Sequence, residues 1–546
     1  MPGRGLAAAG TLGIALMFGS PVLAETAPRL DAGAERERLL RDELLRQQRR
    51  QEGMQPEGDA TITGPELFEP SQLPETGDTF QLSAIEFDES AFFSAAELQR
   101  LADEYIDRDI SFRELNDLVN RVNAWYGARG IITARALIPP QRIDDGVLQV
   151  RLVEGRLGAF IVEGAGSTRE RYLRWRLGLT DGEVIDVAAL EAAVTRLNRT
   201  GDLSSAAALR AGERTGETDV LLQVHEPPRW HVQVFADNAG STSTGEYRGG
   251  MMLGVNSPLG VRDRLSMLVL GSEGSLNGSI GYDFPVTRSG GRIDLRYVQG
   301  DIEVVDGPYR AFGLEGDSRE MSIGFDQPLT RSSRWWWDSS LRVARSESET
   351  TLDEFPFSEY SIDRASVATQ ITRFGQYSQW TWRQGVQYAR LDDQVMDDEE
   401  GFVVFDGLYN VTVMPFERWA GTVRGAWQYI DDKAVPSPLH YQVGGTNTVR
   451  GYPESTIAGS RGYFVNLETR YRPGTALSPF AFIDHGLIDD ISPNREHLLS
   501  AGLGFNWRWT RYIEGELVYG HTFREILPDQ DDWRVHARIS VSWPGY

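Results

Sequence analysis

A two-residue alternation of apolar and polar side chains dominates the C-terminal part of the chain and is clearest in its last strand-length segment. The apolar set there is Trp533, Val535, Ala537, Ile539, Val541 and Trp543, and the polar set between them is Arg534, His536, Arg538, Ser540 and Ser542. Successive side chains of a strand point to opposite faces, so the segment predicts a strand with one apolar and one polar face. A tilted strand crosses a bilayer with about 9–11 residues, and tryptophan at both ends is typical of the aromatic girdles of membrane barrels.

The same alternation recurs from Arg229 to Tyr546, where Trp, Tyr and Phe are frequent and Gly and Asp occupy the turns. Segments 292–297 and 463–470 alternate in the same way. A soluble β-sandwich would also alternate, but it would bury its aromatic face in a thin core. At roughly 20 residues per strand and turn, the region predicts a transmembrane antiparallel β-barrel of about 16 strands.

Residues 1–24 have the parts of a secretory signal peptide. Arg4 precedes the apolar run 6–18, and Val22-Leu23-Ala24 supplies small residues before a cleavage site that follows Ala24. The run is too short and wrongly flanked for a membrane helix, which favours a cleaved signal over the alternative of a disordered tail.

Asp31–Glu52 is rich in Arg, Glu, Leu and Gln and predicts a helix of about 33 Å. Because the helix is charged on most of its surface, it fits no apolar core, and we expect it in solvent or in a polar channel. Residues 53–79 contain four prolines and several acids and predict a linker.

Between this linker and the barrel an α/β pattern occurs twice. The first copy has predicted strands at 80–85, 131–137 and 147–153, with two helices that open with the capping boxes Ser94–Glu97 and Ser111–Glu114. The second copy has strands at 159–162, 206–209 and 220–224 and helices at 170–177 and 187–197. A period of about 75 residues indicates two tandem domains rather than a solenoid.

Composition restricts the chemistry. The net charge of −24 disfavours nucleic acid as a partner, and the absence of cysteine excludes thiol catalysis, cysteine-ligated zinc and disulfides. The seven histidines lack metal-ligand spacing, and no Gly-rich phosphate loop is found. Asp484 and His485 are strand neighbours that point to opposite faces, so they cannot share a catalytic site. We therefore expect no catalytic residue, metal site or cofactor, and no enzyme.

Two motifs in the barrel stand out. Val449-Arg450-Gly451-Tyr452 lies in a Gly-rich loop, and Phe482-Ile483-Asp484-His485-Gly486 lies on a strand whose parity turns Asp484 into the lumen. A lumenal carboxylate and a loop arginine could form a charge-assisted pair, with Gly486 leaving room for the loop. An exposed turn arginine and a solvated lumenal acid would give the same sequence, so the residues alone leave both readings open.

These two motifs resemble the paired signatures of the superfamily of outer-membrane transporters and assembly factors with polypeptide-transport-associated (POTRA) domains. Within it, the chain resembles the two-partner secretion (TpsB-type) branch through motifs in its first α/β domain and at the start of its barrel. They are Tyr126-x-x-x-Gly130-Ile-Ile-Thr-Ala-Arg, Pro139-Pro140-Gln141-x-x-x-x-Gly146, Val153-Glu154-Gly155, Asp237-Asn238-Ala239-Gly240 and Thr244-Gly245. The resemblance covers essentially the whole mature chain.

The resemblance implies a 16-stranded barrel at 229–546, POTRA domains at 80–156 and 157–228, and the helix 31–52 as a plug in the pore. It also implies an inward-folded sixth loop whose tip, Arg450, contacts Asp484. The implied partners are a large secreted exoprotein with an N-terminal secretion domain, the lipid bilayer of the outer membrane, and the barrel-assembly machinery during biogenesis. The chain departs from the branch at its C-terminus, where Trp543-Pro544-Gly545-Tyr546 replaces a final Phe, and at Pro453 after the loop motif.

The leading hypothesis is thus an outer-membrane translocator that recognises an exoprotein through periplasmic POTRA domains and exports it unfolded through the pore. The alternative is an assembly factor that inserts other barrels. The chain has two POTRA copies, preceded by a helix and a proline-rich linker. This order favours the translocator, because assembly factors of the superfamily usually carry more POTRA copies and no plug. A barrel enzyme is disfavoured by the absence of a catalytic constellation.

Overall fold

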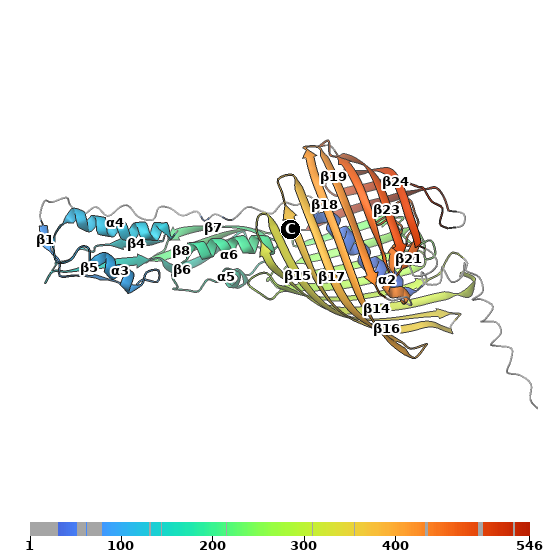
Figure 1. Ribbon diagram of the computed structural model, residues 1–546, viewed down its shortest axis with the longest axis horizontal. Helices are drawn as coiled ribbons and strands as arrows, with labels where there is room; N and C mark the ends of the chain where they lie inside the picture. The colour runs from blue at the N-terminus through green and yellow to red at the C-terminus, as the bar shows by residue number, and fades with distance from the viewer. Residues whose placement is uncertain are drawn as a thin grey trace, which may run out of the picture.

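The computed structural model describes residues 31–51, 60, 62 and 79–545, with short gaps at 130, 132, 144, 215, 308–309, 354, 432–434, 475, 490–494 and 528–529. A barrel and two small α/β units extend along one axis, with the units projecting from one end of the barrel (Figure 1). The predicted signal peptide and most of the predicted linker lie outside the described residues.

Sixteen antiparallel strands close the barrel, because the last strand pairs with the first. The strands are β9 Trp230–Asp237, β10 Arg248–Asn256, β11 Arg264–Gly271, β12 Ser275–Pro285, β13 Arg292–Glu303, β14 Leu314–Arg331, β15 Trp335–Leu352, β16 Phe355–Phe374, β17 Ser378–Asp393, β18 Asp398–Phe416, β19 Trp419–Ile430, β22 Gly462–Tyr471, β23 Leu477–Asp489, β24 Arg495–Arg508, β25 Ile513–Thr522 and β26 Trp533–Gly545. Between β19 and β22, the short strands β20 Tyr441–Val443 and β21 Ile457–Gly459 form a separate hairpin. The predicted 16-stranded barrel is confirmed.

Side-chain exposure follows the predicted alternation. On β26 the side chains of Trp533, Ile539 and Trp543 are 43–53% exposed, whereas His536 and Ser540 between them are buried. The exposed aromatic face lies outside a closed barrel instead of between two sheets, which rules out the sandwich. Among the described helices, none combines the length and the apolar character needed to cross a membrane.

The two α/β units share one plan. The first contains β1 Thr79–Gln81, β2 Ala84–Phe87, α3 Ala95–Ala102, β3 Asp109–Ser111, α4 Phe112–Ala128, β4 Ala134–Leu137 and β5 Val147–Glu154. The second contains β6 Arg156–Glu163, α5 Glu170–Leu177, α6 Val187–Thr200, β7 Ser204–Ala211 and β8 Glu217–His225. Their sheets have the orders β2-β5-β4 and β6-β8-β7, each with one parallel and one antiparallel pair, and each unit has its own apolar core.

Both predicted capping boxes are confirmed, since Ser94 and Glu97 as well as Ser111 and Glu114 bond each other's backbone N–H groups. The single strand predicted at 80–85 is wrong. The chain bends at Ser83, where the backbone N–H and the hydroxyl donate to the 145–146 turn, and this divides the segment between the small sheet β1-β3 and the main sheet.

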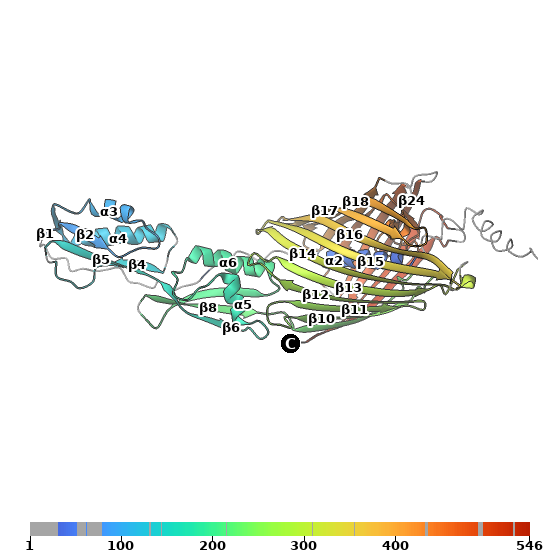
Figure 2. The same cartoon turned by 90° about the horizontal axis from the view of Figure 1, so that it is seen from below.

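The two units are joined closely, and the second is docked on the barrel (Figure 2). At the junction Gly155 donates to the carbonyl of Thr133 and accepts from the N–H of Ile185; a Cβ at Gly155 would come within 2.9 Å of the Thr133 backbone. At the barrel, buried Arg262 of the β10–β11 turn forms two hydrogen bonds of 2.5 and 2.6 Å with Asp202. The second unit therefore has a fixed position on the rim at which β9 begins.

Helix α2, Ala32–Gln51, lies inside the barrel (Figure 1). It contacts β13, β14, β15 and the 3-10 turn Ser437–Leu439, so the charged helix that the sequence predicts lies in the lumen instead of bulk solvent. Two residues of the predicted linker are described. Ala60 and Ile62 donate backbone hydrogen bonds to Thr195 and Glu191 of α6, and Ile62 is buried in the core of the second unit.

Candidate functional site in the barrel lumen

Arg450 is buried at the tip of the inward loop between β19 and β22, with 4% of its surface exposed. Its Nε and Nη2 donate to Asp484 Oδ2 and Oδ1 at 2.8 Å each, and its backbone N–H donates to Asp484 Oδ2 at 3.1 Å. Its guanidinium carbon also lies 3.7 Å from the centre of the Phe482 ring. The two sequence motifs therefore meet through a bidentate, charge-assisted pair and a cation–π contact.

Strand β23 presents the wall half of this site. Asp484 is fully buried on the lumenal face, whereas Ile483 is 52% exposed on the outer face, as the parity of the strand predicts. Gly486 leaves room for the loop, because a Cβ there would lie 2.4 Å from Val443 and 2.8 Å from Val449 side-chain atoms.

The remaining loop-motif residues are also held. Val449 and Tyr452 are fully buried in an apolar cluster, and the Tyr452 hydroxyl donates to the carbonyl of Arg524 at 3.0 Å. Gly451 has a φ of +97°, which favours glycine, and its N–H donates to Nε2 of His536 at 3.2 Å. These three residues thus position the arginine.

Glu468 is a member of the site that the motifs did not indicate. Its Oε2 accepts from Nη1 of Arg450 at 2.9 Å, and its Oε1 accepts from Arg470 at 2.7 Å, while Arg424 lies 3.6 Å away. One buried carboxylate therefore faces three guanidinium groups and balances part of their charge. The only signal in the sequence was the alternation of polar residues in segment 463–470.

A second contact joins the same loop to α2. The Glu454 carboxylate accepts from the N–H and the hydroxyl of Thr446 at 2.9 and 2.8 Å, and it lies 3.7 Å from Arg38 of α2. Gln442, before the loop, donates to the carbonyl of Ala34 at 3.2 Å. The loop therefore contacts the lumenal wall on one side and the helix on the other.

Helix α2 is attached to the wall mainly by polar groups. Tyr360 donates to Asp31 at 2.5 Å, and Arg364 bonds both Glu37 of the helix and Glu320 of β14, the latter at 3.1 Å. Arg41 lies over the Tyr441 ring at 4.6 Å from its centre. These contacts explain why a helix with so much charge is stable inside a barrel.

The described residues contain no group of three or more His, Asp or Glu side chains arranged to hold a metal ion. Asp484 and His485 point to opposite faces of β23, with Asp484 fully buried on the lumenal side. The ion pairs of the lumenal site hold the inward loop and α2 in place.

In the first α/β unit, the sequence motifs around Tyr126 and Glu154 also come together. The Tyr126 hydroxyl donates to Glu154 at 2.9 Å, and Ser90 and the N–H of Ala91 donate to the same carboxylate. Burial, and then the bond to Glu154, raise the pKa of Tyr126. The pair connects α4 to the end of β5, just before the junction with the second unit. Gly130 lies outside the described residues.

Comparisons with known proteins agree with this architecture. The family described as haemolysin secretion/activation protein ShlB/FhaC/HecB matches residues 216–508, and the ShlB-type POTRA domain matches residues 80–155. The outer membrane transporter CdiB-2 of Burkholderia pseudomallei (strain 1026b) is 24% identical over 452 residues, which are 77% of this chain and 74% of that protein. The hemolysin transporter protein HpmB of Proteus mirabilis is 22% identical over 467 residues, 76% of this chain and 78% of that protein.

Among solved structures, CdiB from Escherichia coli has the same fold, with a TM-score of 0.64 at 20% identity over 94% of this chain and 98% of that one. The family match covers the barrel from β9 to β24 and the end of the second unit, and it supports the translocator over the assembly-factor alternative. The chain belongs to the haemolysin secretion/activation family ShlB/FhaC/HecB and is an outer-membrane transporter of two-partner secretion, with its POTRA domains in the periplasm.

Proposed function

We propose that this transporter captures a large secreted partner by its N-terminal secretion domain and passes it unfolded through the barrel once α2 has left the lumen. In this proposal, residues 80–156 and 157–228 are the capture domains, residues 229–546 form the pore, and α2 is its plug. Arg450 and Asp484 hold the loop in the position that export requires.

The observation that carries the proposal is the polar attachment of α2. A helix that belongs permanently to a core buries an apolar stripe, whereas α2, although Leu45 packs in an apolar cluster, is held largely by ion pairs and hydrogen bonds to Tyr360, Arg364 and Gln442. Water and an extended polypeptide can replace such contacts, because the polar wall stays hydrated when the helix departs. The attachment therefore fits a plug that moves.

Free strand edges support capture by the POTRA domains. In the described residues, β2 and β4 pair on one side only in the first sheet, and β7 does so in the second, as does β6 beyond a short bridge between Arg156 and Val184. Such edges present unpaired backbone groups, and an extended peptide can add to them as a further strand. Backbone pairing of this kind selects an unfolded partner segment over a folded one.

The outer surface of the barrel supports contact with lipid. Apolar side chains that face outward include Leu503, which is 65% exposed, and Trp337, which is 46% exposed. We also propose that the barrel-assembly machinery recognises the C-terminal strand through Trp543, which is 43% exposed on the outer face.

A disulfide lock tests whether α2 leaves. The chain has no cysteine, and a Cβ built at Gly316 of β14 lies 3.1 Å from the Cβ of Ala32 in α2. A shift of under about 1 Å brings a pair of cysteines introduced at these two positions to the usual Cβ separation of about 3.8 Å. The variant A32C/G316C is expected to export the partner under reducing conditions and to stop when oxidised.

The matched control is T372C/T381C, which joins the directly paired strands β16 and β17 and leaves α2 free. Oxidation of this control, and of each single-cysteine variant, is expected to leave export unchanged. Full export by the oxidised A32C/G316C protein would show that the helix remains in place during transport and would overturn the proposal.

A second experiment separates a transporter from an assembly factor at the capture step. The tandem unit Phe80–Pro228, which contains both apolar cores, is titrated with the N-terminal fragment of the secreted partner and with C-terminal peptides of other barrel proteins. Binding of the partner fragment is expected. Binding confined to the barrel peptides would contradict capture by these domains.

A further inference from the structure

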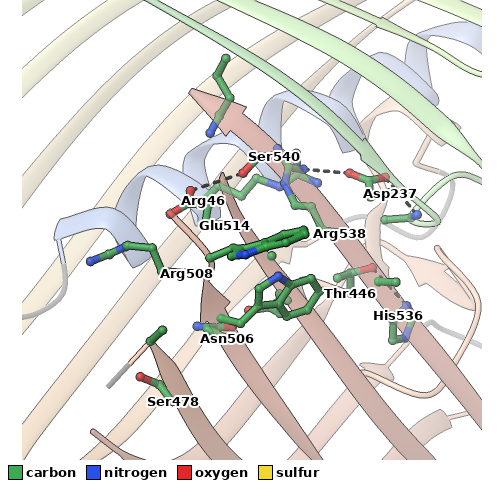
Figure 3. A pocket seen from close by; sticks show the side chains of 18 of the residues that line it. Arg46, Asp237, Thr446, Ser478, Asn506, Arg508, Glu514, His536, Arg538 and Ser540 are labelled. Carbon is green, nitrogen blue, oxygen red and sulfur yellow. Dashed lines mark hydrogen bonds and ion pairs between the residues drawn. The ribbon is translucent and has the colours of Figure 1, made fainter. Parts of the chain in front are cut away.

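A cavity of about 820 Å³ lies in the lumen at the side of the barrel formed by β22 to β26 and β9 (Figure 3). The turn Trp509–Tyr512, which joins β24 to β25, lines the cavity. The strand pairing puts this turn at the same rim as the start of β9, where the second POTRA domain is attached. The cavity therefore lies at the periplasmic rim. At its inner end the cavity reaches Thr446 and Asn447 of the inward loop. It therefore leads from the periplasmic mouth to the loop that carries Arg450.

Most of the wall of the cavity belongs to the lumenal face, and Trp507, Gly515 and Ala537, which have the opposite parity, also line it. Ser478, Asn506, Glu516, Arg538 and Asp237 form one row of directly paired residues across five strands, and Arg508, Glu514 and Ser540 form the next row. Residues of opposite parity point outward, as Leu503 and Ile539 do with exposures of 65% and 47%.

The cavity is basic in a strongly acidic protein. Six arginines line it, namely Arg46 of α2 together with Arg470, Arg472, Arg508, Arg511 and Arg538, against three acids, Asp237, Glu514 and Glu516. The whole chain has a net charge of −24. A patch of opposite sign inside a low-dielectric wall focuses the field and concentrates anions at the entrance.

Four of these six arginines form no ion pair with a carboxylate in the described part of the chain. Arg538 is paired with Asp237 at 2.8 Å, and Arg470 with Glu468 at 2.7 Å. Within the described ranges, by contrast, no carboxylate lies within 4.0 Å of the guanidinium groups of Arg46, Arg472, Arg508 or Arg511. Figure 3 shows Arg46 and Arg508 beside the same space as the paired Arg538.

We propose that this cavity is a binding site for an acidic, extended segment of polypeptide, which it receives from the periplasm. The site rests on the assignment of the protein as a transporter and adds a chemical preference to its pore. Guanidinium groups form bidentate pairs with carboxylates, and several of them spread over neighbouring strands can engage successive Asp or Glu side chains of one extended chain. The hydroxyl and amide groups of Ser478, Ser540 and Asn506 supply partners for its backbone.

The test uses the full-length protein in detergent and the labelled hexapeptide acetyl-(Glu-Gly)₃. We expect binding that weakens as salt is raised, and at least roughly tenfold weaker binding of the matched (Gln-Gly)₃ and (Lys-Gly)₃ peptides, because charge pairing supplies the affinity. The double variant R508Q/R511Q removes two such pairs and is expected to bind the acidic peptide roughly five- to thirtyfold more weakly, since each exposed ion pair contributes about 0.5–1 kcal/mol.

The matched control is R310Q/R495Q, which removes the same charge from exposed positions at the opposite rim of the barrel and is expected to bind as the parent does. Heat-modifiable migration in gels verifies that each barrel is folded, and R472Q/R511Q, which changes only turn residues, repeats the test in a second background. Equal weakening by R508Q/R511Q and R310Q/R495Q would overturn the site.

Two further outcomes would overturn the peptide assignment. One is equal affinity for (Gln-Gly)₃, and the other is complete displacement of the acidic peptide by an equal concentration of inorganic phosphate, which would indicate an unselective anion site. The measurement needs no export, because the cavity exists with α2 in the lumen. A failure of the plug proposal in the disulfide experiment therefore leaves this test intact.

Discussion

Replacement of Arg450 by alanine is expected to stop export while the barrel still assembles. The substitution removes two side-chain hydrogen bonds to Asp484, one to Glu468 and the contact with the Phe482 ring. Glu468 keeps Arg470 at 2.7 Å, but Asp484 is fully buried and keeps only the backbone N–H of residue 450. Breaking a buried pair in this way costs about 3–5 kcal/mol.

A loss of that size shifts the equilibrium between the docked and the undocked loop by a factor of roughly 10² to 4 × 10³, because each 1.4 kcal/mol is tenfold. Export of the partner into the medium is measured beside the amount of heat-modifiable barrel in the membrane. R450K is expected to fall between the parent and R450A, since one ammonium cannot bond both Asp484 oxygens and Glu468 with the geometry of a guanidinium.

Arg461 provides the matched control, because it lies between the same two barrel strands and pairs with Asp431 at 3.2 Å, where Asp431 is 82% exposed. R461A is expected to export normally, as exposed pairs contribute about 0–1 kcal/mol. Normal export by R450A with an assembled barrel would refute the reasoning, and so would an equal defect in R461A.

Three further predictions concern the plug and the first POTRA domain. Deletion of Asp31–Glu52 should raise the single-channel conductance in planar bilayers, because a helix about 10 Å wide is removed from the lumen, and unchanged conductance would contradict its position there. Y126F should lower the free energy of unfolding of the tandem POTRA unit by about 1 kcal/mol in urea titrations, since Glu154 loses one of its donors; an unchanged midpoint would count against the bond. The backbone N–H of Ser111 and then Arg108 hold the pKa of Glu114 below its usual range, so its stabilisation is present above about pH 4.3 and is lost as the pH falls through the lowered pKa. E114Q should therefore show a smaller decrease in Tm between pH 6 and pH 3 than the parent, as measured by circular dichroism.

The sequence predicted those parts of the site that depend on local geometry. The lumenal orientation of Asp484 follows from strand parity, and the room beside Gly486 follows from the absence of a side chain. The helix 31–52 was identifiable from its composition, and its charge left only solvent or a polar channel as surroundings. Each of these inferences needs only a few consecutive residues.

The parts that could not be predicted depend on contacts between distant segments. Glu468 is 18 residues from Arg450, Arg38 is far from Glu454, and Asp202 is far from Arg262, and no local pattern records which of the many charged residues meet after the barrel closes. The same holds for Ile62, which belongs to a segment with the composition of a linker but is buried in the second POTRA domain. Closure of the barrel, the folding of the second unit and its docking on the rim fix these partners, and each of these depends on segments far apart in the chain.

The two sides of the inward loop respond differently to the departure of α2. All partners of Arg450 lie in the loop or the wall, so its pairs with Asp484 and Glu468 remain when the helix leaves. Glu454 has its only ion pair in the described residues with Arg38 of α2, and its side chain is 6% exposed. Withdrawal of α2 therefore removes the cation beside Glu454 and opens that side of the loop to the water of the lumen, which can solvate the carboxylate. The proposed exit of the plug thus changes the surroundings of Glu454, while the tip at Arg450 keeps the loop attached to the wall.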